Sequence, residues 1–93
     1  MATSTIKDKK IHYVDFSVAG TAVTSADAGW YYAEVDLPNT IPQGTLVIGV
    51  GKAGSWDASV FFSLYGNSKI LITSPTSRTL GSNRNIRIFY QYY

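Results

Sequence analysis

The C-terminal segment is the feature that most constrains the fold of this chain. Residues 85–93 read Asn-Ile-Arg-Ile-Phe-Tyr-Gln-Tyr-Tyr. Side chains alternate between the two faces of a β-strand, so the two isoleucines and two of the tyrosines share one face: Ile86, Ile88, Tyr90 and Tyr92. Chain termini are usually frayed and polar. A terminus this aromatic therefore predicts a strand locked into a sheet, in a compact β domain that uses both faces of its sheets.

The remainder of the chain reads as short alternating segments separated by turn-forming residues, and no segment keeps a helical period. Six strands are expected at about 11–19, 30–37, 45–51, 56–65, 68–74 and 85–93, with weaker pairing near Thr21–Thr24. The pattern predicts an all-β fold: an antiparallel, jelly-roll-like β-sandwich of about six to eight strands. Residues 11–93 are expected to form a single domain, preceded by a polar N-terminal lead over residues 1–10.

The alternation assigns an inner face to each strand. The expected inner residues are His12, Val14, Phe16 and Val18; Tyr31, Ala33, Val35 and Leu37; Trp56, Ala58, Val60, Phe62 and Leu64; and Ile70 and Ile72. In the third strand Leu46, Ile48 and Val50 share a face, and the glycines opposite them predict a bulge or a close backbone approach. The segment 25–29 is expected to be a loop, and Pro75 is expected to end the fifth strand. The segment 75–85 is the longest polar stretch.

The chain has few charges and many outward-facing rings. Charged residues make up 15% of the sequence, against about 25% in an average soluble domain. The rings expected on the outer faces are Tyr13, Trp30, Tyr32, Phe61, Tyr65, Phe89 and Tyr93. Without cysteine, the chain has no disulfide to supplement its core. A surface this apolar predicts burial against further copies, and we expect a homo-oligomer, a trimer.

The sequence carries no motif that indicates catalysis, a metal or a cofactor. Its single histidine, His12, lies on the apolar face of a strand and is expected to be a hydrogen-bonded core or interface residue rather than a base. A Ser-His-Asp triad could be completed by one of several aspartates, but the sequence contains no nucleophile elbow for its serine. Glu34 and Asp36 lie about 7 Å apart along one strand face, a spacing that glycosidases use but that is also common without function. Gly49–Lys52 lacks the spacing of a phosphate-binding loop. We expect a protein that is not an enzyme.

Nucleic-acid and membrane partners are not expected either. The net charge is +2, and the one basic cluster, Lys7, Lys9 and Lys10, is interrupted by Asp8, as in a solvated lead-in segment. No apolar run approaches the roughly 18 residues of a membrane span. The first five residues lack the apolar core of a signal peptide.

Two features are candidates for ligand binding. The first is the outward row Trp30, Tyr32, Glu34 and Asp36, because rings stack on the C–H faces of sugars and carboxylates accept hydrogen bonds from hydroxyls; a subunit interface explains this row equally well. The second is the polar loop, where Arg78 and Arg84 are suited to a phosphate or carboxylate on a glycan, beside the outward Asp57; the alternative is a solvated loop. The predicted ligand contacts are Trp30, Tyr32, Asp57, Arg78 and Arg84.

Several short segments resemble a known family. Trp30-Tyr31-Tyr32 leading to Val35-Asp36-Leu37-Pro38, then Ile48-Gly49-Val50, a polar loop, and the terminal Asn85–Tyr90 are similar to the C-terminal head domains of bacteriophage tail-fibre and receptor-binding proteins. The likeness covers roughly residues 28–93. It implies a trimeric β-sandwich or jelly-roll-like head that belongs to a virion and binds a host cell-surface saccharide through loops or subunit clefts.

Two other functions stay open at this point. One is a structural virion protein, such as a capsid decoration protein or a tail component, whose partners are only other virion proteins. The other, less favoured, is a module of a carbohydrate-active enzyme.

Overall fold

The computed structural model describes residues 10–66 and 68–92, and these contain nine β-strands and no helix. The strands are β1 (His12–Ser17), β2 (Ala22–Val23), β3 (Ser25–Asp27), β4 (Trp30–Asp36), β5 (Thr45–Gly54), β6 (Phe61–Tyr65), β7 (Lys69–Ser74), β8 (Arg78–Thr79) and β9 (Arg84–Tyr92). The predicted all-β fold is confirmed. The number of strands exceeds the expected six to eight because it includes three very short ones, β2, β3 and β8, which have two or three residues each.

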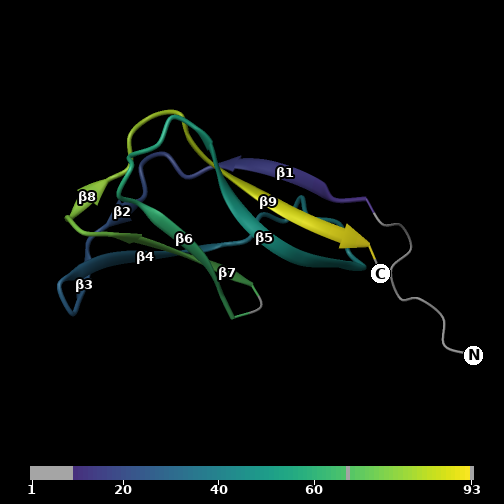
Figure 1. Cartoon of the computed structure of the whole chain (residues 1–93), viewed down its shortest axis with the longest axis horizontal. Helices are drawn as coiled ribbons and strands as arrows, with labels where there is room; N and C mark the ends of the chain where they lie inside the picture. The colour runs from purple at the N-terminus through teal and green to yellow at the C-terminus, as the bar shows by residue number, and fades with distance from the viewer. Residues whose placement is uncertain (1–9, 67, 93) are drawn as a thin grey trace, which may run out of the picture.

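The strands form three antiparallel sheets, consistent with a β-sandwich (Figure 1). The three-stranded sheet has the order β1-β9-β5, and the four-stranded sheet has the order β3-β4-β7-β6. The pair β2-β8 forms a small third sheet at the left of Figure 1. The C-terminal strand β9 is therefore the centre of its sheet, paired on both sides from Asn85 to Tyr90.

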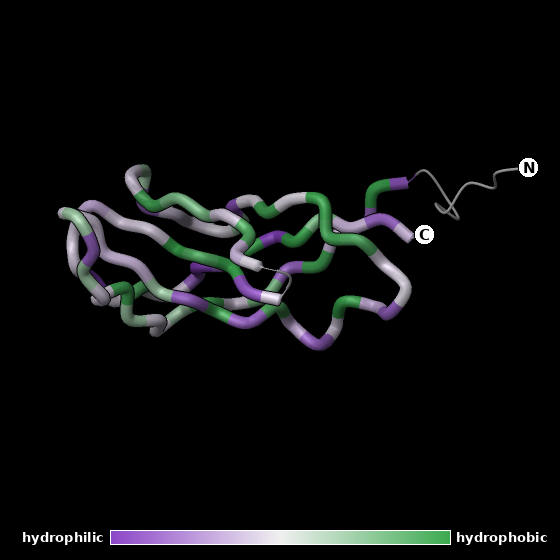
Figure 2. Tube along the Cα trace, turned by 90° about the horizontal axis from the view of Figure 1, so that it is seen from below, coloured by the Kyte–Doolittle hydropathy of each residue, from purple (hydrophilic) through white to green (hydrophobic). Residues whose placement is uncertain are grey.

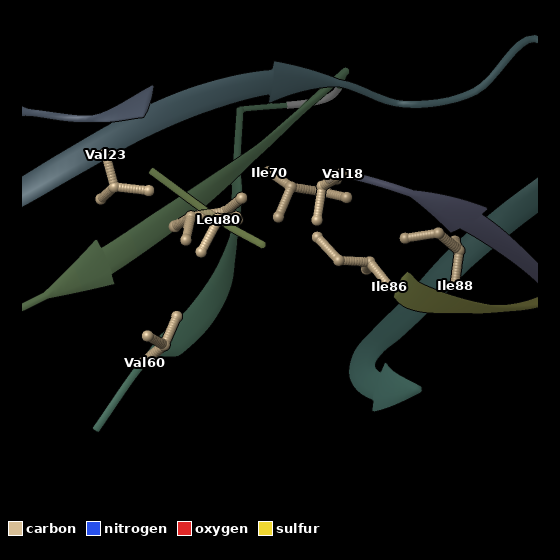
Figure 3. Close-up of a cluster of buried hydrophobic side chains, with 8 residues drawn as sticks. Val18, Val23, Val60, Ile70, Leu80, Ile86 and Ile88 are labelled. Atoms are coloured by element: carbon tan, nitrogen blue, oxygen red, sulfur yellow. The ribbon is translucent and has the colours of Figure 1, made fainter. Parts of the chain in front are cut away.

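The core lies between the two larger sheets. Ile86 and Ile88 of β9 and Ile70 and Ile72 of β7 are fully buried. Figure 3 shows side chains of this cluster converging from different strands and loops: Val18, Val23, Val60, Ile70, Leu80, Ile86 and Ile88. Each fully buried aliphatic side chain stabilises the fold by about 1.5–3 kcal/mol. The prediction that the terminal strand is locked into a sheet is confirmed. Tyr93 and residues 1–9 of the polar lead lie outside the described residues.

The predicted bulge in the third strand is confirmed, and it reverses part of that strand. The register of β5 against β9 skips one residue, Ile48, between Val47 and Gly49. An extra residue turns the following side chains to the other face. Val47 and Val50 consequently pack on the core, whereas Leu46 is 53% exposed. The prediction that Leu46, Ile48 and Val50 share one face is therefore wrong.

The segment predicted as a loop at 25–29 forms a hairpin instead. Ser25–Asp27 is β3, and Asp27 pairs with Trp30 of β4. The turn residues Ala28 and Gly29 have φ of 51° and 85°. Two left-handed residues match the type I′ turn that suits a tight hairpin. The polar composition of this segment concealed a short strand.

The strand predicted at 56–65 begins only at Phe61. The Trp56 indole N–H donates to the carbonyl oxygens of Ala53 (2.9 Å) and Asn85 (2.7 Å), and the Val60 N–H donates to the Asp57 carbonyl at 3.3 Å. These bonds hold residues 56–60 in a turn, so Ala58 is exposed rather than inward. Trp56 is half-buried, and its ring lies 4.6 Å from that of Phe62, as expected for a core residue. Leu64, expected to be buried, is 41% exposed, since β6 is an edge strand.

The polar stretch 75–85 is also more ordered than its composition indicates. Pro75 follows the last residue of β7, as predicted. Arg78–Thr79 then pairs with Ala22–Val23, which confirms the weak pairing expected there. Leu80 is 2% exposed and belongs to the core. Figure 2 shows hydrophobic stretches along the strands and hydrophilic residues at several of the turns. The stretch thus closes one end of the sandwich.

Candidate functional site

The outer face of the four-stranded sheet carries a shallow hollow. Its volume is about 220 Å³, and it is lined by Asp27, Tyr32, Glu34, Tyr65 and Leu71. These residues come from four adjacent strands, β3, β4, β7 and β6. We refer to this feature as the sheet hollow.

The ladder of the sheet fixes the position of each lining side chain. Glu34 of β4 lies directly opposite Leu71 of β7, and Tyr32 lies opposite Ser25 and Thr73 on the two neighbouring strands. Opposite residues of an antiparallel ladder project from the same face, about 4.5–5.5 Å apart. The inner face of the same strands carries the fully buried Ile70 and Ile72. The hollow therefore rests on a rigid core rather than on loops.

The chemistry of the sheet hollow combines rings with uncommitted acceptors. Tyr32 is half-buried, Tyr65 is 52% exposed, and Leu71 adds an aliphatic surface. Asp27 and Glu34 are exposed, and neither forms an ion pair or a side-chain hydrogen bond with another of the described residues. The carboxylates are therefore available to accept hydrogen bonds from a ligand.

The predicted outward row on β4 is confirmed in orientation. Trp30, Glu34 and Asp36 are exposed, and Tyr32 is half-buried. Trp30 is 45% exposed and lies two residues, or about 7 Å along the strand, from Tyr32. At the other end of the row, the Asp36 carboxylate accepts a 2.7 Å ion-pair bond from Lys69 Nζ. Glu34 and Asp36 are thus in different states: Asp36 forms an ion pair with Lys69, whereas Glu34 acts on Lys69 only as a nearby charge.

Three of the predicted site residues meet elsewhere, in an ion-pair cluster. Asp57 Oδ2 lies 3.4 Å from Arg78 Nη1, and Asp57 Oδ1 lies 3.4 Å from Arg84 Nη2. The three side chains are 33%, 26% and 21% exposed, respectively. Burial raises the pKa of the Asp57 carboxyl, but the hydrogen bonds and charges of the two arginines outweigh it, so the pKa lies below its usual value. The carboxylate stays charged between two cations.

This cluster ties together three separate segments of the chain. Arg84 also donates to the Ser82 carbonyl at 2.8 Å, and Arg78 donates to Thr76 Oγ1 at 2.7 Å. The turn at 56–60, the strand β8 and the start of β9 are joined in this way. The Nε–H groups of both arginines are buried and have no hydrogen-bond partner in the part of the chain that the structure describes. The Nη groups of both arginines bind Asp57, Thr76 and Ser82 of this protein. Ligand binding by Asp57, Arg78 and Arg84 stays a prediction.

Sequence reasoning missed part of the sheet hollow. The outward row on residues 30–36 predicts that Tyr32 and Glu34 share a face. The sequence pattern assigns Asp27 to a loop and Tyr65 only to the outward rings. The signal that joins Asp27 to the hollow is the Ala28–Gly29 turn, which folds β3 onto the edge of β4.

His12 lies against the aromatic end of β9. Its ring stacks at 5.5 Å on Tyr90 and meets Tyr92 edge-on at 5.2 Å. Burial, followed by the neighbouring Tyr92, raises the pKa of the Tyr90 hydroxyl. These contacts fit the packing role expected of His12.

The described residues include no group of three or more His, Cys, Asp or Glu side chains placed to hold a metal ion. Over the same part of the chain, no helix is long and apolar enough to cross a membrane.

Comparison of the chain with protein-family models, with curated proteins and with solved structures finds no match in any of the three. The assignment of a function consequently rests on the geometry of the sheet hollow and on the sequence resemblance.

Proposed function

We propose that this protein is a non-enzymatic saccharide-binding module and that the sheet hollow is its binding site. The observation that carries the proposal is the meeting of two tyrosines, Tyr32 and Tyr65, with two uncommitted carboxylates, Asp27 and Glu34, in one hollow. Sugar recognition requires an apolar surface for the C–H face of the ring and fixed acceptors for its hydroxyls. The hollow supplies both on a rigid support.

The charge of the hollow narrows the ligand class. The two lining residues that are charged at neutral pH, Asp27 and Glu34, are both acidic, and an acidic sugar would meet like charges that oppose binding. The site therefore suits a neutral or an amino sugar. Trp30, exposed on the same strand face, extends the stacking surface to a second ring of a longer glycan.

The resemblance to phage receptor-binding heads supplies a biological setting for this proposal. In that setting the module belongs to a virion and attaches it to a saccharide on the host cell surface. Its partners are further copies of itself, other virion proteins and the host glycan. The proposal assigns no catalytic role to the strand-face pair Glu34 and Asp36, because the Asp36 carboxylate is held by Lys69 at 2.7 Å.

A titration of the isotope-labelled protein with a panel of neutral, amino and acidic oligosaccharides, followed by NMR, tests the proposal. Neutral or amino sugars should shift the amide signals of β3, β4 and β7. Tyr32→Ala should weaken binding about tenfold, equivalent to about 1.4 kcal/mol. The matched control is Tyr13→Ala, which removes a 56% exposed tyrosine from the other sheet and should leave binding unchanged. Shifts confined to residues outside the hollow would contradict the assignment.

The structural virion protein is the second candidate, and one observation favours it. Several rings are exposed on outer faces of both sheets, among them Tyr13, Phe61 and Tyr65. Such rings also suit a protein–protein contact. Binding of virions or purified protein to host cells separates the two candidates. If Trp30→Ala and Tyr32→Ala lower adhesion while the assembly stays intact, the receptor-binding function is supported; if either variant loses the assembly, the structural function is favoured.

A further inference from the structure

The open edge of β6 differs from the other sheet edges of the molecule. In each larger sheet the outermost strands have no pairing partner on one side among residues 10–66 and 68–92: these are β1 and β5 in one sheet, and β3 and β6 in the other. An unpaired edge presents backbone N–H and C=O groups that attract another strand, and proteins usually blunt it by shortness, charge, proline or a bulge.

Three of the four edges carry such a device. β3 has only three residues. β1 carries Asp15 within its six residues. β5 contains the bulge between Val47 and Gly49 and the charged Lys52. The β6 strand itself carries none of these devices: its sequence Phe-Phe-Ser-Leu-Tyr has no charge and no proline, and its ladder with β7 is regular. The nearest charge from β5 is Lys52, whose Nζ lies 5.9 Å from the centre of the Phe61 ring.

The side chains of β6 are exposed as well as uncharged. Phe61 is 56% exposed, Leu64 41% and Tyr65 52%. Leu64 lies opposite the fully buried Ile70, so it belongs to the inner face and is uncovered only at the open edge. A further strand beside β6 would cover it. Beyond the ladder with β7, the backbone of Phe61–Tyr65 forms no hydrogen bond within the described residues.

We propose that β6 pairs antiparallel with β6 of a second copy about a two-fold axis at Ser63. The sequence of the strand is symmetric in character about this residue: ring, apolar, small, apolar, ring. Pairing places Phe61 opposite Tyr65 of the second copy on the outer face, and Phe62 opposite Leu64 of the second copy on the inner face. Aromatic and apolar cross-strand pairs of this kind stabilise antiparallel ladders. The paired strands bring no like charges opposite each other, because β6 carries none, and Lys52 of β5 reaches only the Phe61 end of the strand.

The partner strand is β6 of a second copy, because the residue pattern of β6 is complementary to itself when the strand is reversed. A two-fold contact requires such a self-complementary surface. The same pairing at β1 would bring two Asp15 side chains near the axis. Two joined four-stranded sheets form one eight-stranded sheet. The pairing does not depend on saccharide binding, although Tyr65 belongs to both features and two hollows would then open on one continuous face.

The oligomeric mass of the full chain gives the first test. Sedimentation equilibrium should yield a dimer, twice 10.2 kDa, rather than the trimer that the resemblance implies. Ser63→Lys places two like charges at the axis and should raise the dissociation constant by roughly tenfold or more. The control Ser25→Lys alters an exposed serine on the opposite edge of the same sheet and should leave the dimer intact. A monomer at high concentration, a trimer, or a dimer unaffected by Ser63→Lys would overturn the proposal.

Cysteine cross-linking gives the second test and decides the outcome if Ser63→Lys fails to fold. The chain has no cysteine, so Ser63→Cys introduces a single thiol. Residues directly opposite in an antiparallel pair have Cα atoms about 4.5–5.5 Å apart, within the disulfide range of about 4.4–6.8 Å. Ser63→Cys should form a covalent dimer under mild oxidation, and Ser25→Cys should not. Equal cross-linking of both variants, or of neither, would refute pairing at Ser63.

Discussion

The outer faces of the two larger sheets carry similar residue types in different states. On the three-stranded sheet, Arg87 holds Asp15 through two bonds of 2.8 and 2.9 Å, and its guanidinium lies 4.2 Å from the centre of the Tyr13 ring. On the four-stranded sheet, Asp27 and Glu34 form no such bond within the described residues and lie beside Tyr32 and Tyr65 in a hollow. On the three-stranded sheet the polar groups bond to one another, so few remain to bind a ligand. In the sheet hollow the carboxylates of Asp27 and Glu34 remain available as acceptors.

Phe89 shows how the three-stranded sheet closes its own surface. A Cβ atom built on Gly51 would lie 3.4 Å from Phe89 Cε2, and one on Gly49 would lie 3.9 Å from Cδ2. The ring therefore lies over the glycine backbone of β5 rather than projecting into solvent. The glycines of β5 make room for the ring, and Phe89 is half-buried.

The largest expected effect comes from removing the central strand of the three-stranded sheet. Deletion of residues 86–93 removes the fully buried Ile86 and Ile88 together with the ladders to β1 and β5. At about 1.5–3 kcal/mol for each buried side chain, the loss approaches the whole stability of a small domain, about 5–15 kcal/mol. We expect no cooperative thermal transition by circular dichroism. A soluble deletion variant that melts cooperatively would show that the strand is peripheral.

A smaller effect is expected from two adjacent positions on β7 that face opposite ways. Ile72 is fully buried, and Leu71 lines the sheet hollow. Ile72→Ala should destabilise the protein by about 2–5 kcal/mol, as for other core truncations. Leu71→Ala should cost clearly less stability but weaken saccharide binding. Chemical denaturation and NMR titration of both variants measure the two quantities. Equal losses of stability would mean that the outer face is packed as tightly as the core.

The sequence predicted the sheets more fully than the site, and particular residues show why. Alternation in β9 and β7 depends on burial of one face, and the fully buried Ile70, Ile72, Ile86 and Ile88 follow it. The glycines of the third strand predict a bulge, but its position at Ile48 and its effect on Leu46 depend on the register against β9. The turn at 56–60 depends on Trp56 bonding to Asn85, 29 residues away. Such long-range bonds leave no local pattern.

The sheet hollow illustrates the same limit. Tyr32 and Glu34 are two residues apart on one strand, so their shared face follows from sequence alone. Tyr65 and Leu71 join them only because β4, β7 and β6 are adjacent. The order of strands in a sheet is a tertiary property, and it decided which of the outward rings meet the carboxylates. The pairing of Asp57 with Arg78 and Arg84 depends in the same way on the folding of three distant segments together.

The ion-pair cluster predicts an acid-dependent loss of stability. The folded pKa of Asp57 is lowered by the two arginines, so its contribution is present above the unfolded pKa, about 3.9. It is lost as the pH falls through the lower folded pKa. Asp57→Asn should be less stable than the wild type at pH 7, and the difference should shrink at pH 3. Denaturant midpoints at several pH values measure this, and a constant difference would show that the Asp57 charge is not linked to folding.

The smallest expected effect on stability comes from removing the ion pairs on the two outer faces, and it should differ between them. Asp15 and Arg87 are each 37% exposed and joined by two bonds, whereas Asp36 is 80% exposed and joined to Lys69 by one. Exposed single pairs contribute little, because solvent and salt screen them and the side chains lose freedom. Asp36→Asn should leave the melting temperature unchanged, and Asp15→Asn should lower it slightly, less so at high salt.

The pKa of Asp15 is lowered by its hydrogen bond to Arg87, so the loss of stability caused by Asp15→Asn should also become smaller in acid. If Asp36→Asn proves the more damaging change, the ion pairs on the outer face of the four-stranded sheet contribute more to stability than their exposure indicates.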